Sequence, residues 1–147
     1  MLKKILATTI AFAGLSVAPA AYAQSGEIIR QLSNQLSEAR DLYVPNNYRL
    51  VRGPDNDLLS AGDSDNYTVT LQGGSSYKLV GVCDDDCTDL DIILYDSDGD
   101  VVDRDMLDDD KPVVSVSGKS GGRYRMNVSM ASCSTSVCYY SVAIYGN

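Results

Sequence analysis

The stretch Gly81–Asp100, GVCDDDCTDLDIILYDSDGD, combines a close cysteine pair, a group of acids, a short apolar pattern and a turn. Leu90, Ile92 and Leu94 recur at every second residue, so they fall on one face of a β-strand. The run DSDGD at 96–100 consists of residues that favour tight turns. This stretch therefore predicts a strand and a hairpin turn within an exported β-domain.

The same alternation of apolar and polar residues returns in several short segments. Strands are expected at 66–71, 77–83, 90–95, 101–102, 113–117, 123–130 and 139–145, with a further short strand at Tyr48–Arg52. Turns of Gly, Asp and Ser separate these seven or eight segments, and no strand-helix-strand alternation occurs. The pattern indicates an all-β fold in which two antiparallel sheets pack as a sandwich.

One amphipathic helix is predicted before the strands, from Ser25, which can cap it, to Tyr43. Its expected apolar face consists of Ile28, Ile29, Leu32, Leu36, Ala39, Leu42 and Tyr43. This face must be covered, either by the protein's own body or by a partner or second copy, and we expect the former. The predicted organisation is a signal peptide at 1–23, the helix at 24–44, a linker at 45–65 and the sandwich at 66–147.

The N-terminal residues have the pattern of a secretory signal peptide. Lys3 and Lys4 precede an apolar segment, Ile5–Val17, which is too short for a good membrane span. Small residues lead up to Ala23, after which we expect cleavage, leaving no membrane span in the mature chain. The expected location is the bacterial periplasm or the medium. Cleavage changes the net charge from −8 to −10, and such an acidic chain is a poor partner for nucleic acid.

All four cysteines, Cys83, Cys87, Cys133 and Cys138, lie beyond the predicted signal. An even number in an exported chain indicates disulfides. The pairs Cys83–Cys87 and Cys133–Cys138 are favoured because each brackets a short polar loop. A cross-pairing would close a longer loop, and zinc is an alternative use of four thiols, although the spacings differ from the usual C-x2-C.

Several segments together resemble the bacterial pre-peptidase C-terminal domain family. They are GDSDNYTVTL at 62–71, GGSSY at 73–77, DLDIILYD at 89–96 with Gly99, and GRYRMNV at 122–128. The resemblance covers about 58–145. It implies a jelly-roll-like β-sandwich, and it implies a domain that accompanies secreted peptidases and in some members binds calcium or polymers. Here only a signal and one helix precede the domain, so an appendage of a peptidase in the same chain is not expected.

The sequence offers little for catalysis. It has no histidine, which removes Ser-His-Asp and Cys-His arrangements. The S-x-x-K at 75–78, S-D-N at 64–66 and K-S-G at 119–121 echo the penicillin-binding set, but their order and context are wrong. Paired carboxylates can cleave glycosidic bonds, yet nothing marks out two of the many acids. We therefore expect a protein that is not an enzyme, with a carboxylate-based hydrolase as the minor alternative.

Calcium is a better use of the acids, because clustered carboxylates repel one another until a hard cation binds. The candidate ligands are Asp84, Asp85, Asp86, Asp89, Asp91, Asp108, Asp109 and Asp110. The run at 96–100 lacks the spacing of an EF-hand loop and is interpreted as a hairpin turn.

The expected function is that of an exported, non-catalytic binding module for a secreted protein, a cell-wall polymer or Ca²⁺. A companion or inhibitor acting in trans on a separately encoded secreted peptidase is the alternative that the family resemblance implies. Calcium is the one cofactor that the sequence suggests, and no nucleic acid is expected among the partners.

Overall fold

The computed structural model describes residues 20–117 and 121–147. Within them one helix precedes eight strands. The elements are α1 (Ala20–Tyr43), β1 (Arg49–Leu59), β2 (Ser64–Leu71), β3 (Ser76–Cys83), β4 (Cys87–Tyr95), β5 (Val101–Asp105), β6 (Val113–Ser117), β7 (Gly122–Cys133) and β8 (Cys138–Gly146). The prediction of one helix followed by seven or eight strands is confirmed.

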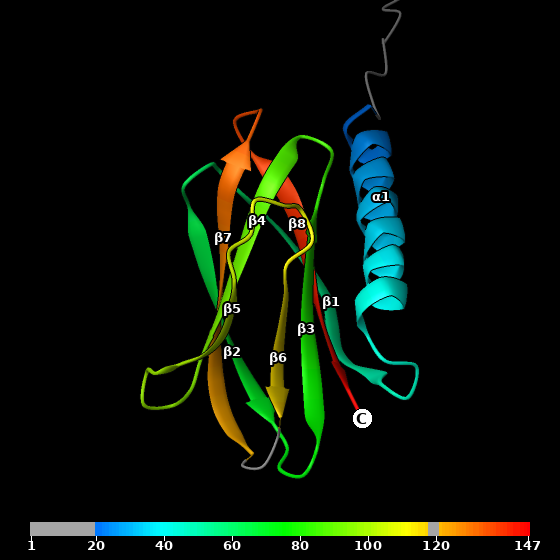
Figure 1. Cartoon of the computed structure of the whole chain (residues 1–147). Coiled ribbons are helices and arrows are strands. Elements are labelled where there is room, and N and C mark those ends of the chain that lie inside the picture. Colours follow the sequence, from blue (N-terminus) through cyan, green and yellow to red (C-terminus); the bar gives the residue numbers. More distant parts are fainter. Residues whose placement is uncertain (1–19, 118–120) are drawn as a thin grey trace, which may run out of the picture.

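The strands form two four-stranded antiparallel sheets with the orders β1-β8-β3-β6 and β2-β7-β4-β5. β1 pairs with β8, β2 with β7, and β3 with β6. In the sequence these pairs are nested around the β4–β5 hairpin. This is the winding of a jelly roll, in which two sheets face each other across one core (Figure 1). The predicted antiparallel sandwich is therefore confirmed.

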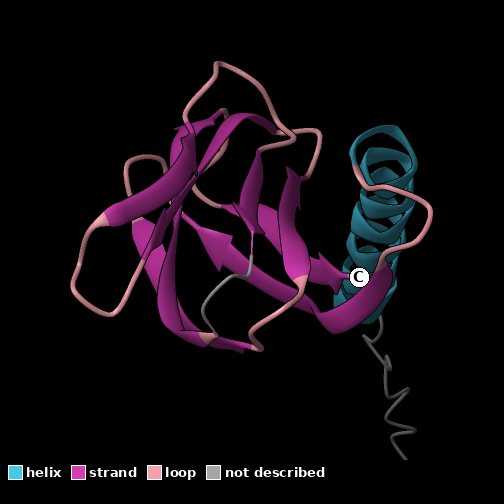
Figure 2. Ribbon diagram, turned by 60° about the horizontal axis from the view of Figure 1, so that its bottom comes forward, coloured by secondary structure: helices cyan, strands magenta, loops and turns pink. Residues whose placement is uncertain are grey.

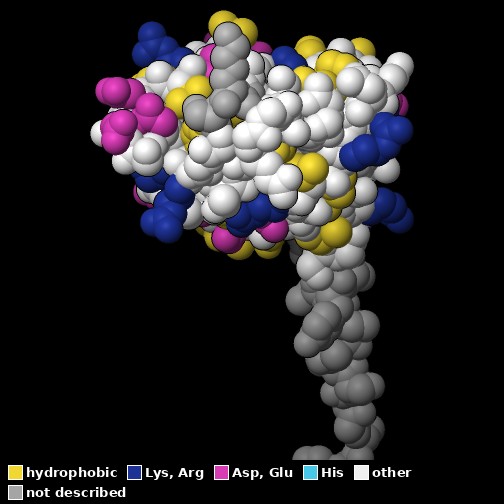
Figure 3. All heavy atoms as spheres, turned by 90° about the horizontal axis from the view of Figure 1, so that it is seen from below, with side chains coloured by type: hydrophobic (Ala, Val, Ile, Leu, Met, Phe, Trp, Pro, Cys, Tyr) yellow, Lys and Arg dark blue, Asp and Glu magenta, His cyan; other side chains and the backbone are white. Residues whose placement is uncertain are grey.

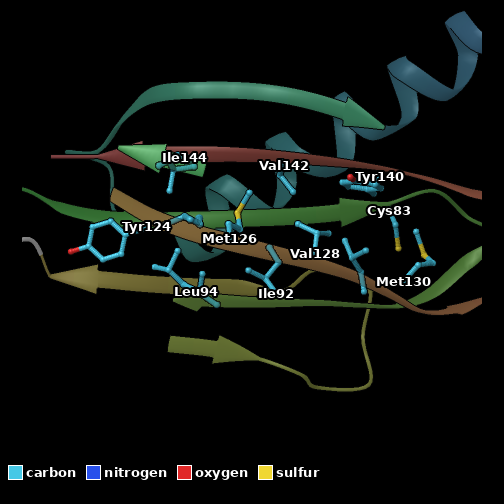
Figure 4. Close-up of a cluster of buried hydrophobic side chains, with 14 of the residues drawn as sticks. Cys83, Ile92, Leu94, Tyr124, Met126, Val128, Met130, Tyr140, Val142 and Ile144 are labelled. Atoms are coloured by element: carbon cyan, nitrogen blue, oxygen red, sulfur yellow. The ribbon is translucent and has the colours of Figure 1, made fainter. Parts of the chain in front are cut away.

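The main core lies between the two sheets. Leu90, Ile92 and Leu94 of β4 are fully buried, as their alternation predicts. Their layer is shared with side chains from the facing sheet, and Figure 4 shows Ile92 and Leu94 pointing toward Val142 and Ile144 of β8. The core thus uses aliphatic side chains from both sheets and the Met side chains of β7, with tyrosines at its ends.

A buried tyrosine ties the sheets together through polar contacts. Tyr140 of β8 is 0% exposed, and its hydroxyl donates to Asp65 Oδ2 of β2 at 2.7 Å. The hydroxyl of Tyr67, also on β2, forms a second hydrogen bond to it. Burial raises the pKa of Tyr140, and the bonds to Tyr67 and Asp65 act in the same direction. The buried hydroxyl is therefore satisfied as a neutral group.

The helix forms a third layer on the outer face of the β1-β8-β3-β6 sheet (Figure 2). Leu32, Leu36 and Ala39 are buried against Val80 and Val82 of β3, together with side chains of β8. The expectation that the helix packs on the protein's own body is confirmed. Because this contact buries a continuous apolar stripe, the position of α1 relative to β3 and β8 is fixed by packing.

Two details of the predicted helix are wrong. The helix begins at Ala20, so Ser25 lies inside it and does not cap its start. The buried stripe is also narrower than predicted, since Ile29, Leu42 and Tyr43 are 44%, 64% and 48% exposed. A straight helix meets a sheet along one line, which leaves the margins of a wide apolar face in solvent. The predicted signal peptide falls mostly on residues outside those described.

The open sides of the sandwich are bridged by charged side chains. Asp103 and Asp105 of β5 accept hydrogen bonds from the backbone N–H groups of Ser115 and Val113 of β6, at 2.7 and 2.9 Å. On the opposite side, Arg52 of β1 donates to the backbone oxygen of Thr68 on β2 at 2.9 Å. These contacts satisfy edge groups that would otherwise be free to pair with another chain.

The linker predicted at 45–65 is wrong, because most of it is the edge strand β1. The strand runs over Arg49–Leu59 and pairs with β8, whereas the prediction placed a short strand at Tyr48–Arg52. Its register shifts twice between Leu50 and Asp55, around the cis peptide bond of Gly53-Pro54. The register shifts interrupt the alternation of apolar and polar residues. Charged residues on this edge strand further obscure the strand pattern in the sequence.

Candidate functional site

Both disulfides lie at the same end of the sandwich. Cys83–Cys87 closes the β3–β4 loop and Cys133–Cys138 closes the β7–β8 loop, which confirms the favoured pairing. Cys87 and Cys133 are partners in the register of β4 and β7, so the two closed loops are neighbours. No cysteine is free, which points to an oxidising compartment and removes the thiols as zinc ligands.

The β3–β4 loop is held rigidly by the strands around it. The backbone of Asp84 donates to Tyr139 O at 2.9 Å, and Asp84 Oδ2 accepts from the Tyr139 N–H at 2.8 Å. Asp86 O accepts both the N–H and the hydroxyl of Ser134, at 2.8 and 2.9 Å. The acids of this loop are therefore displayed from a fixed backbone, and Figure 1 shows the loop facing the N-terminal half of α1.

A groove of about 680 Å³ separates α1 from this loop. Its helix wall extends from Glu27 to Glu38, and its opposite wall is Asp84–Asp86. The helix residues lie on one face over about three turns, so the groove is about 16 Å long at 1.5 Å per residue. The lining residues are Glu27, Ile28, Arg30, Gln31, Asn34, Gln35, Glu38, Asp84, Asp85 and Asp86.

The groove has a strongly negative lining. Five carboxylates line it against a single guanidinium, that of Arg30. Arg30 pairs with Glu27 at 3.9 Å, but both side chains are more than 70% exposed, so this ion pair is weak. A side-chain hydrogen bond crosses the groove from α1 to the loop, with Gln35 Nε2 donating to Asp85 Oδ1 at 3.4 Å.

Three buried polar atoms in the groove lack a hydrogen bond within the described part of the chain: Asp84 Oδ1, Gln31 Nε2 and Gln35 Oε1. Asp84 is the most buried of these residues, with only 6% of its surface exposed. Buried polar atoms in folded proteins are nearly always paired, and leaving one unpaired costs about 1–3 kcal/mol. The walls of the groove therefore contain two buried acceptors and one buried donor without a partner among the described residues.

Burial raises the pKa of Asp84 above the usual aspartate value, against the opposing effect of the Tyr139 N–H. The charge of Asp86 raises it further, whereas the N–H groups of Asp86 and Cys87 lower it. Those two N–H groups lie near enough to lower the pKa of the carboxyl, but neither forms a hydrogen bond to Oδ1. A buried carboxylate in this setting gains stability from a cation placed beside its free oxygen.

The other predicted calcium ligands lie outside the groove. Burial raises the pKa values of Asp89 and Asp91 on β4. Nearby charges also raise them, those of Asp108 and Asp109 acting on Asp89 and those of Asp89 and Asp105 acting on Asp91. The structure thus brings Asp89 of β4 near the acids of the β5–β6 loop.

Most acids of the β5–β6 loop have structural contacts of their own. Asp109 Oδ1 accepts from the N–H of Lys111 at 2.9 Å, and Asp110 forms an ion pair with Lys111 Nζ at 3.0 Å. In residues 20–117 and 121–147, no three His, Cys, Asp or Glu side chains are grouped as metal ligands would be. Calcium binding by the predicted acids stays a prediction.

Lowering the pH from neutral should stabilise the fold through Asp84, Asp89 and Asp91. Their folded pKa values lie above the usual 3.8, so the folded state binds protons more readily than the unfolded chain. Above the raised pKa values the folded state bears the full free-energy cost of burying the three charged carboxylates. As the pH falls through the raised values toward 3.8, the carboxylates become protonated in the folded state and this cost disappears. Urea unfolding at a series of pH values between neutral and acid measures this slope.

The variant Asp84→Asn should reduce that slope, because it removes one of the three titrating groups while keeping an oxygen for the Tyr139 N–H. Asp98→Asn makes the same charge change in the exposed β4–β5 turn and controls for net charge. Equal slopes in the wild type and Asp84→Asn would show that Asp84 does not titrate with a raised pKa.

The helix wall of the groove was missed by the sequence analysis, which assigned α1 only a packing role. Gln31 and Gln35 stand four residues apart beside the buried Leu32 and Leu36, so a polar stripe flanks the apolar one. That stripe is visible in the sequence, but nothing there shows that the β3–β4 loop lies opposite it. Only the docking of α1 on β3 and β8 brings the two walls together.

The described residues at the opposite end of the sandwich form a smaller hollow. Viewed from that end, acidic side chains gather at one edge and basic ones are scattered around the rim (Figure 3). A hollow of about 280 Å³ lies there, between residues such as Val51, Gln72 and Tyr77. None of its lining side chains is among those with a buried, unpartnered polar atom in the described residues.

No family model and no curated protein matches this chain. The helix within the described residues is not long and apolar enough to cross a membrane. The geometry of the groove is therefore the main guide to function.

Proposed function

We propose that this protein is a non-catalytic exported binding module whose ligand site is the groove between α1 and the β3–β4 loop. The proposal includes export by the predicted signal peptide with cleavage near Ala23. It also retains the resemblance to pre-peptidase C-terminal domains, whose jelly-roll-like fold agrees with the strand order found here.

One observation carries the proposal. Asp84 is only 6% exposed and lines a groove of about 680 Å³, yet its Oδ1 is buried without a hydrogen-bond partner among the described residues. A side chain with only a structural role would have hydrogen-bond partners for both of its buried oxygens, whereas Asp84 has one only for Oδ2, the Tyr139 N–H. Ligand sites are usually pre-formed concave surfaces in which a few placed polar groups fix the ligand, and the unpartnered atoms of this groove are candidates for such groups.

The proposal is tested by site-specific photocrosslinking in cells that export the protein. A photoreactive residue at Asn34, which is exposed and lines the groove, should capture a discrete partner. The same residue at Ser97, exposed in the β4–β5 turn at the other end, is the matched control. The capture at Asn34 should decline when Asp84→Asn is introduced.

Equal products from both positions, or none from Asn34, would refute the groove as the ligand site. If the crosslinking yield at Asn34 were the same with and without Asp84→Asn, the partner would contact the helix and not Asp84. Thermal melts of each variant are compared first, so that a loss of capture is not caused by unfolding.

Calcium binding is proposed separately for the β4 and β5–β6 acids. Calcium at about ten times its dissociation constant would add roughly 1.4 kcal/mol of stability, which corresponds to a rise of a few degrees in Tm. Thermal melts in calcium and in chelator measure this rise. Coincident melting curves would exclude a folded-state calcium site, and the variant Asp89→Asn should abolish any difference.

A further inference from the structure

We propose that the groove recognises a primary ammonium group, presented as a lysine side chain on an extended segment of another exported protein. This inference rests on the proposed function and adds the chemistry of the ligand. It follows from the charge of the lining, the number of free oxygens and the presence of a free donor.

The charge of the lining selects a cation. Five carboxylates and one guanidinium line the groove, and Arg30 is already beside Glu27. An anionic ligand would meet the same field that repels phosphate from the whole chain, whose net charge is −8. A neutral ligand would leave the buried carboxylate of Asp84 uncompensated.

The free acceptors favour an ammonium over a guanidinium. Asp84 Oδ2 already accepts the Tyr139 N–H, and Oδ1 is the oxygen of this carboxylate without a partner among the described residues. A guanidinium binds a carboxylate best through two parallel hydrogen bonds to both oxygens, and here the Tyr139 N–H competes for one of the two. An ammonium is a point charge with three donors, and separate single acceptors such as Asp84 Oδ1 and Gln35 Oε1 suit it.

The free donor and the length of the groove favour a peptide as the carrier of the ammonium. Gln31 Nε2 lacks an acceptor among the described residues, and a peptide carbonyl can supply one. A free polyamine has no acceptor to offer. The groove extends about 16 Å along α1, which accommodates about five residues of extended chain.

The test uses titration calorimetry on the protein recovered after export. The probe is the capped pentapeptide Gly-Gly-Lys-Gly-Gly, and the comparison peptides replace its lysine with arginine, acetyl-lysine or glutamate. Binding of the lysine peptide should be saturable and salt-sensitive. The arginine peptide should bind several-fold more weakly, and the acetyl-lysine and glutamate peptides should not bind measurably. Spermidine, as the polyamine arm, should bind more weakly than the lysine peptide.

Matched variants locate the site. Asp84→Asn should weaken the lysine peptide about ten-fold or more, because it removes the charge from a buried hydrogen bond. Gln35→Leu tests the second acceptor on a different element, so the result does not depend on one variant folding. Asp98→Asn, with the same charge change in the distant β4–β5 turn, should leave the affinity within about two-fold, as expected for an exposed and distant charge.

Equal binding of the lysine and arginine peptides, or tighter binding of spermidine, would overturn the assignment of a peptide-borne ammonium. Equal weakening by Asp84→Asn and Asp98→Asn would show attraction to net charge alone. If the lysine peptide fails to bind while crosslinking at Asn34 still captures a partner that Asp84→Asn abolishes, the inference fails and the proposed function stands.

Discussion

Replacing Leu32 by alanine should destabilise the protein by about 2–5 kcal/mol, the range for a fully buried leucine. Leu32 is 0% exposed at the contact between α1 and the β3–β8 surface. The loss is large because a cavity forms in the contact that holds α1 on the sheet, between Leu32 and its buried neighbours Leu36 and Ala39. Urea unfolding followed by circular dichroism measures it, and it should appear as one cooperative transition.

The matched control is Leu42→Ala, the same chemical change on the same helix at a residue that is 64% exposed. This variant should differ from the wild type by no more than about 0.5 kcal/mol. If Leu32→Ala were equally mild, α1 would not be a layer of the cooperative fold. The groove would then have no rigid second wall.

Gly53→Ala should cost about 2–5 kcal/mol, the second large effect, for two reasons that add. Gly53 has a φ of +89°, where a side chain is strained. A Cβ there would also lie 2.6 Å from the backbone oxygen of Val142 on β8, a contact that only a shift of β1 can relieve. Denaturant titration measures the loss.

Gly62→Ala separates the two causes. Gly62 has a similar φ of +86°, but nothing lies within 4 Å of the added Cβ. It should cost about 1 kcal/mol, since only the backbone strain applies. Equal costs for the two variants would show that the close approach of β1 to β8 at Gly53 does not exist.

The sequence predicted the elements whose periodicity is undisturbed. Leu90, Ile92 and Leu94 alternate without interruption, and all three are buried in the inter-sheet core. The short polar loops between paired cysteines likewise indicated their partners correctly. Local patterns of this kind report which face of a strand is buried, because the period of two is a property of the backbone itself.

The errors occur where tertiary context replaces local pattern. β1 has two register shifts and a solvent-facing edge, so its residues do not alternate and it was interpreted as a linker. Ile29, Leu42 and Tyr43 have the helical period of buried residues, but they lie at the margins of the contact between α1 and the sheet and stay exposed. No single-sequence pattern encodes the width of a partner surface.

Half of the candidate site was visible in the sequence. Asp84, Asp85 and Asp86 were singled out as an acidic loop, although with calcium as the suggested ligand. Gln31 and Gln35 on α1 could not be connected to them, because residues about 50 positions apart meet only through the docking of the helix. We propose an organic cation in place of calcium because Asp84 is a single buried carboxylate with one unpartnered oxygen. Only the structure shows this burial and this lack of a partner.

The most direct test of the groove as a ligand site is a backbone amide NMR titration with the lysine pentapeptide. The account predicts that the largest shifts appear in two segments, 27–38 of α1 and 84–86 of the β3–β4 loop, and that they saturate together with one affinity. Shifts of equal size in the acidic β4–β5 turn at 96–100, or none in either wall of the groove, would contradict it.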